Sequence, residues 1–79
     1  MMEYSIKLDV LRALVAERRA WISAALSVED AKAIPDSAVI NALNAERARL
    51  PNWGTYSDET GIDIEIERWR SIVEGQGRR

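Results

Sequence analysis

The sequence contains no cysteine and no histidine. Without cysteine the chain can form neither a disulfide nor a thiolate metal site, and without histidine it lacks the commonest general base and zinc ligand. Its few glycines are too scattered to make a phosphate-binding loop, since they are Gly54, Gly61, Gly75 and Gly77. We therefore expect no enzymatic activity and no cofactor.

Neither sign of charge dominates, and no apolar stretch is long enough to span a membrane. Eleven basic and thirteen acidic residues are mixed along the 79 residues and give a net charge of −2. A nucleic-acid partner is disfavoured because the chain has no cationic field. Charged residues interrupt the longest apolar stretch, which also lacks the form of a signal peptide. We expect a cytoplasmic protein without a membrane segment.

The longest helical pattern runs from Tyr4 to Leu26 without glycine or proline. At 100° per residue its apolar side chains form an arc roughly 160° wide, broader than the ~100° stripe of an ordinary surface helix. Only two shorter helices are available to cover this arc. We therefore expect the helix to contact a second copy of the chain or another protein, through Val10, Leu11, Leu14, Arg18, Trp21 and Ala25.

One cation, Arg18, lies at the centre of this arc. It falls between Leu11, Leu14 and Ile22, where an unpaired guanidinium is costly to desolvate. Three arrangements are open: the side chain snorkels to a helix edge, pairs with a carboxylate, or binds an anionic ligand. The carboxylate is either Glu46 or one supplied across an oligomer interface.

A break is predicted after the first helix. Ser27, followed by Glu29 and Asp30, has the pattern of an N-cap, which predicts a separate helical turn over residues 28–33. The chain should then leave the helical region before Pro35.

Two further helices are expected. Asp36 is a good N-cap for a helix over residues 37–50, which Pro51 ends. A last helix is predicted over residues 61–74, and residues 75–79 should fray. Within this helix Ile64 falls opposite the apolar stripe, so it is either a stray exposed side chain or a secondary contact.

The connection between these helices holds two aromatic residues, Trp53 and Tyr56. Such a loop either plugs the end of the helix assembly or presents a contact surface.

Together these patterns predict a single all-α domain over residues 1–79, a small three-helix bundle with a long N-terminal helix that self-associates. The expected core is Leu8, Leu11, Val15, Ile22, Leu26, Val39, Leu43, Leu50, Ile62, Ile66, Trp69 and Val73.

The favoured function is a protein–protein interaction module that regulates, adapts or inhibits a larger protein, in the manner of short phage-encoded inhibitors. This hypothesis depends on the wide apolar arc and on the absence of active-site chemistry.

One alternative is a helix-turn-helix made of residues 28–33 and the helix from Ser37. Its side chains for reading bases or phosphates would be Asn41, Asn44, Arg47 and Arg49.

A second alternative is an oligomer that binds an anionic small molecule such as a nucleotide. Arg18, Lys7 and Tyr4 would converge on this ligand where two copies of the first helix meet.

Overall fold

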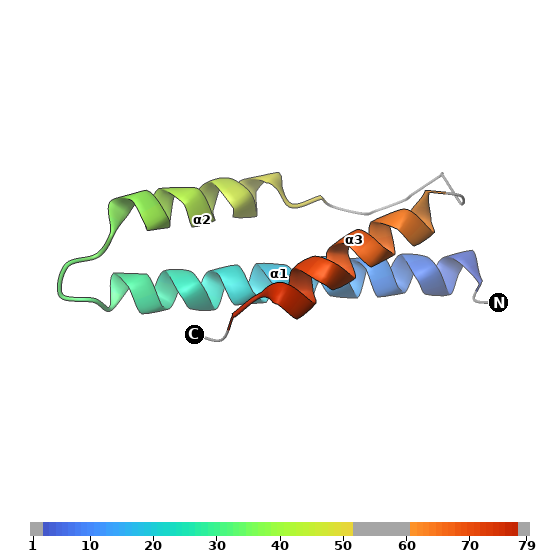
Figure 1. The fold of residues 1–79 in the computed structure, drawn as a ribbon, viewed down its shortest axis with the longest axis horizontal. Helices are drawn as coiled ribbons and strands as arrows, with labels where there is room; N and C mark the ends of the chain where they lie inside the picture. The colour runs from blue at the N-terminus through green and yellow to red at the C-terminus, as the bar shows by residue number, and fades with distance from the viewer. Residues whose placement is uncertain (1–2, 52–60, 78–79) are drawn as a thin grey trace.

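The computed structural model describes residues 3–51 and 61–77. It contains three helices, α1 (Tyr4–Asp30), α2 (Ser37–Arg49) and α3 (Ile62–Gly75), and these residues form no strand (Figure 1). The all-α prediction is therefore confirmed. The predictions for Trp53 and Tyr56 lie outside the described residues.

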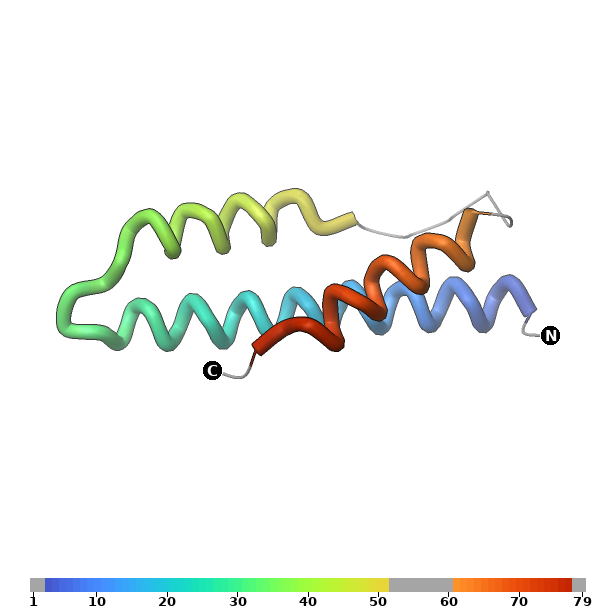
Figure 2. The backbone as a smooth tube through the Cα atoms, viewed as in Figure 1, coloured from blue at the N-terminus to red at the C-terminus, as the bar shows by residue number. Residues whose placement is uncertain are grey.

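α1 is the axis to which the other two helices attach. α2 returns beside the C-terminal half of α1, whereas α3 crosses its N-terminal half (Figure 2). In the described part of the chain no Cα atom of α2 lies within 8 Å of a Cα atom of α3, so the two helices do not pack backbone to backbone. The molecule measures 50 × 20 × 14 Å, so the helices form an elongated, open arrangement. The predicted three-helix bundle is confirmed only in its helix content.

α1 is longer than the sequence pattern predicts. It continues to Asp30, so the break after Leu26 and the separate helical turn over residues 28–33 are wrong. Ser27 caps no new helix; its carbonyl accepts the Ala31 N–H at 3.1 Å. Leu26 and Glu29 are both buried, and this packing keeps the last turn helical.

The connection from α1 to α2 is held by two carboxylates. Glu29 is only 1% exposed, and its Oε1 accepts the backbone N–H of Asp36 at 2.9 Å. Asp36 in turn caps α2, since its Oδ1 accepts the N–H groups of Ala38 at 3.0 Å and Val39 at 3.4 Å. The prediction of Asp36 as the N-cap is confirmed, and α2 ends at Arg49, two residues before Pro51.

The core is divided into two clusters along α1. The first joins the N-terminal half of α1 to α3 and consists of Leu11, Val15, Ile62, Ile66 and Trp69. The second joins the C-terminal half to α2 and consists of Ile22, Ala25, Leu26 and Leu43. Most of the predicted core is buried, whereas four of its members are only half-buried: Leu8, Val39, Leu50 and Val73.

Candidate functional site

The contact face predicted on the first helix is largely covered by the chain itself. Leu11 and Ala25 are 0% exposed, so both side chains pack inside this chain and do not face outward. Val10, Leu14 and Trp21 are half-buried and pack against the core clusters. Much of the arc is covered within the chain because α2 and α3 lie over successive lengths of α1.

Arg18 is paired with Glu46 on α2, one of the arrangements that the sequence left open. Arg18 Nε donates to Glu46 Oε2 at 2.7 Å, and Nη2 donates to Oε1 at 2.9 Å. The guanidinium also stacks over the ring of Trp21, 4.3 Å from its centroid. This two-bond fork is the strongest common geometry for an arginine and a carboxylate, and it satisfies the cation inside the apolar arc.

The same arginine reaches the segment after α3. Arg18 Nη1 donates to Gln76 Oε1 at 3.4 Å, and the indole N–H of Trp21 donates to the carbonyl of Gly77. These bonds hold residues 76 and 77 against the middle of α1. Arg18 therefore connects α1, α2 and the end of α3, although α2 and α3 do not pack backbone to backbone.

Glu46 is electrostatically perturbed by this pairing. The hydrogen bond from Arg18 lowers the pKa of Glu46 from its ordinary value of 4.5; partial burial opposes this shift and the nearby positive charge of Arg18 adds to it. The Glu46 carboxylate is therefore held ionised, and it is occupied by a partner within the chain.

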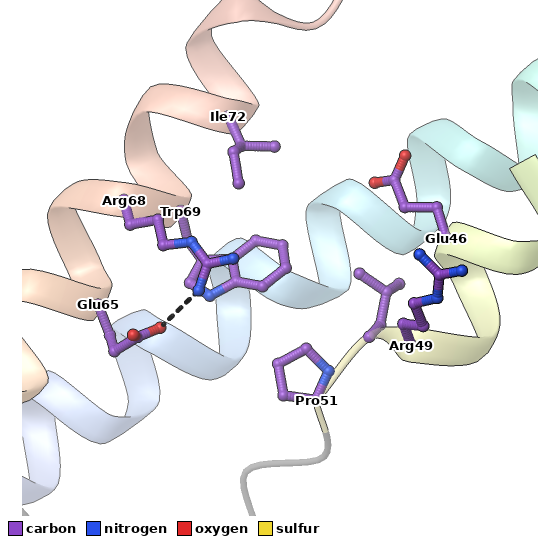
Figure 3. A pocket seen from close by; sticks show the side chains of 8 residues that line it. Glu46, Arg49, Pro51, Glu65, Arg68, Trp69 and Ile72 are labelled. Carbon is purple, nitrogen blue, oxygen red and sulfur yellow. Dashed lines mark ion pairs between the residues drawn. The ribbon is translucent and has the colours of Figure 1, made fainter. Parts of the chain in front are cut away.

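An open groove lies between the C-terminal end of α2 and α3. It encloses about 410 Å³, and Figure 3 shows the side chains around it. The apolar part of the lining is Leu50, Pro51, Trp69 and Ile72, and the charged part is Glu46, Arg49, Glu65 and Arg68. The groove exists because α2 and α3 rest on α1 without packing backbone to backbone.

Trp69 forms the most buried part of the groove wall. Its side chain is 7% exposed, and its indole N–H has no acceptor among the described residues. Arg68 lies over the Trp69 ring at 5.7 Å from the centroid and pairs with Glu65 at 3.7 Å, as Figure 3 shows. The groove thus has a largely buried aromatic side chain in its wall and an exposed arginine at its edge.

Ile64, the predicted secondary contact, is on the surface. It is 71% exposed and lies one helical turn before Arg68, on the same side of α3. Ile64 is therefore an exposed apolar side chain on α3 that lies outside the groove lining.

The helix-turn-helix alternative requires a separate first helix over residues 28–33. Residues 28–30 instead belong to α1, and residues 31–36 form the connection to α2. Asn41, Asn44 and Arg47 are exposed on α2, and Arg47 donates to Asn44 at 2.9 Å.

The three residues expected to converge on an anionic ligand do not meet within one chain. Lys7 pairs with Asp63 at 3.0 Å, and Arg18 lies eleven residues further along α1, about 16 Å away at the helical rise. The hydroxyl of Tyr4 is buried and has no partner among residues 3–51 and 61–77. Both cations are already paired with carboxylates, which disfavours this alternative.

The sequence pattern missed two structural residues, Glu29 and Gln76. The sequence pattern predicts Glu29 as part of a cap. Its bond to Asp36 crosses the turn between two helices, where helical periodicity does not predict contacts. Gln76 was assigned to a frayed tail, although a half-buried amide there meets Arg18.

No three side chains among the described residues gather as candidate metal ligands. Within the same residues no helix has the length and apolar character needed to cross a membrane. Comparison with protein-family models, with curated proteins and with solved structures finds no match.

Proposed function

We propose that this chain is a non-enzymatic protein–protein interaction module that regulates, adapts or inhibits a larger protein. The observation that carries the proposal is the groove between α2 and α3, which combines an apolar lining with a charged edge. This combination is the usual anatomy of a protein interface, with an apolar centre and a polar rim.

The composition of the groove supports this proposal. Tryptophan and arginine are the residue types that most often dominate binding energy at interfaces. Trp69 supplies a rigid aromatic surface, and Arg49 and Arg68 stand on opposite walls (Figure 3). Each wall rests on α1, and Arg18 links the two through Glu46 on α2 and Gln76 after α3.

Two of the residues that suggested self-association through α1, Leu11 and Ala25, face the core. An exposed apolar side chain where a second copy would instead meet the chain is Ile64. Light scattering coupled to size exclusion gives the solution mass. A mass of two chains that falls to one when Ile64 is changed to Glu would restore self-association on a new surface.

The proposed function is tested by selecting binders from a displayed library of short random peptides. Peptides that bind the groove should lose binding to Ile72→Ser, because Ile72 lines the groove. Ile6→Ser is the matched control, since Ile6 is exposed on α1 and absent from the lining. Circular dichroism checks that both variants keep their helices. Selected peptides that bind both variants equally, or no selected peptides, would contradict the proposal.

A further inference from the structure

The charged side chains around the groove differ in whether they already have a partner within the chain. Glu46 is held by Arg18 through bonds of 2.7 and 2.9 Å, so this carboxylate is already paired. Arg49 forms no hydrogen bond or ion pair with any residue in the described ranges, and it stands exposed on the α2 wall. Its five N–H donors are therefore available to an incoming acceptor.

The opposite wall also offers donors. Arg68 and Glu65 approach only to 3.7 Å, beyond hydrogen-bond distance, and the Arg68 side chain is 64% exposed. An exposed pair of this kind contributes little to stability, so Arg68 can turn to a better acceptor at small cost. The groove therefore has more free donors than free acceptors, although it is lined by equal numbers of arginines and glutamates.

From this imbalance we propose that the groove binds an acidic amphipathic segment of another protein. The inference rests on the proposed function and names its partner class. The apolar side chains of the segment lie on Leu50, Trp69 and Ile72, and a carboxylate of the segment pairs with Arg49 in the two-bond geometry that arginine prefers.

The groove suits isolated carboxylates better than a polyanion. Only two arginines line it, Arg49 and Arg68 on opposite walls, so it offers partners to one or two separate carboxylates and not to a continuous run of phosphates. The apolar lining likewise suits aliphatic or aromatic side chains. The α3 side of the lining runs from Glu65 to Ile72, so the segment contacts α3 over more than one turn.

The peptide selection described above also tests this inference, through the amino-acid sequences of the peptides that it yields. Peptides selected on the unchanged chain should combine apolar residues with Asp or Glu, and the best of them should bind Arg49→Glu at least about tenfold more weakly. Selection on Arg49→Glu should favour Lys or Arg at the same place. Arg49→Gln should give an intermediate loss, which separates a lost ion pair from the repulsion introduced by Glu.

The matched control is Arg47→Glu. Arg47 lies on the same last turn of α2 but outside the groove lining, so its reversal should leave peptide binding unchanged. Circular dichroism and thermal unfolding check that each variant folds.

The outcomes separate this inference from the proposed function. Peptides that require Ile72 but show no acidic preference, and that bind Arg49→Glu normally, would overturn the inference and leave the interaction module standing. Binding insensitive to Ile72→Ser would overturn both. Heparin or a short oligonucleotide that displaces the selected peptides from the unchanged chain but does not bind Arg49→Glu would also overturn the inference, because that result would identify the groove as a polyanion site.

Discussion

The two shorter helices are attached to α1 by different kinds of interaction. α3 buries three large side chains in the first core cluster, Ile62, Ile66 and Trp69. α2 buries only Leu43, with Val39 and Ile40 packed against the same cluster, and it is also joined to α1 by the bond from Asp36 to Glu29 and the pair of Glu46 with Arg18. The attachment of α3 is thus mainly apolar, whereas that of α2 depends more on hydrogen bonds and charge.

This difference has consequences for how each wall responds to change. Apolar burial does not depend on the protonation of side chains, whereas a carboxylate paired with a cation loses its charge and part of its acceptor capacity when it is protonated. We therefore expect the α2 wall to be the adjustable side of the groove. The following substitutions test this division.

The largest effect is expected from Leu11→Ala. Leu11 is fully buried beneath α3, and removing a buried leucine costs about 2–5 kcal/mol of the free energy of unfolding. Urea unfolding followed by circular dichroism measures this loss. Leu8→Ala is the control, because Leu8 is only half-buried in the same cluster. Equal losses at the two positions would mean that the first cluster is not centred on Leu11.

A smaller loss is expected when the tether at the α1–α2 turn is removed. Glu29→Ala removes the hydrogen bond between the Asp36 backbone N–H and a buried carboxylate, and bonds to charged groups contribute about 1.5–3 kcal/mol. The neighbouring Asp30→Ala provides the control, since Asp30 is exposed. If both variants unfold at the same urea concentration as the unchanged chain, the turn is not held by Glu29.

The N-cap of α2 should contribute less. Asp36→Ala removes the oxygen that accepts from Ala38 and Val39, and loss of such a cap typically costs about 1 kcal/mol. Asp36→Asn should recover most of this loss because asparagine is an equally good cap. Thermal unfolding of both variants measures the difference. Equal destabilisation by alanine and asparagine would show that the carboxylate acts through its charge.

The smallest effect at neutral pH is expected from Glu46→Gln, but it should depend on pH. The folded pKa of Glu46 lies below the unfolded value of 4.5, so its ionised form stabilises the folded state above that pH. This contribution is lost as the pH falls through the lowered folded pKa. Because the Glu46 side chain is 39% exposed, water reduces the effect at every pH.

Urea unfolding of the unchanged chain and of Glu46→Gln across the acidic range tests this dependence. The gap in stability between the two should close on acidification. A gap that stays constant down to the lowest pH would contradict the role assigned to the ionised pair.

The sequence predicts best where an apolar stripe is strictly periodic. Ile62, Ile66 and Trp69 were placed in the core because their spacing of four and three residues puts them on one face of a helix. The pairing of Arg18 with Glu46 was also within reach, because a cation in an apolar arc requires a carboxylate on a neighbouring helix.

Sequence patterns do not predict the features that depend on how the helices are arranged relative to one another. Ser27, Glu29 and Asp30 have the same pattern whether they start a helix or continue one, and burial of Glu29 decides between these. Leu11 and Ala25 were assigned to an interface because periodicity does not show that α2 and α3 lie one after the other along α1. The groove is invisible to periodicity for the same reason, since it depends on the space between two helices.

Hydrogen exchange of backbone amides, measured by nuclear magnetic resonance on the unchanged chain and on Arg18→Met, tests the central claim most directly. The different attachment of the two helices predicts that the substitution lowers protection throughout α2 and leaves the protection of the α3 residues Ile66–Trp69 nearly unchanged. Equal loss of protection in α2 and α3 would contradict this division and show that the two walls of the groove form one cooperative unit.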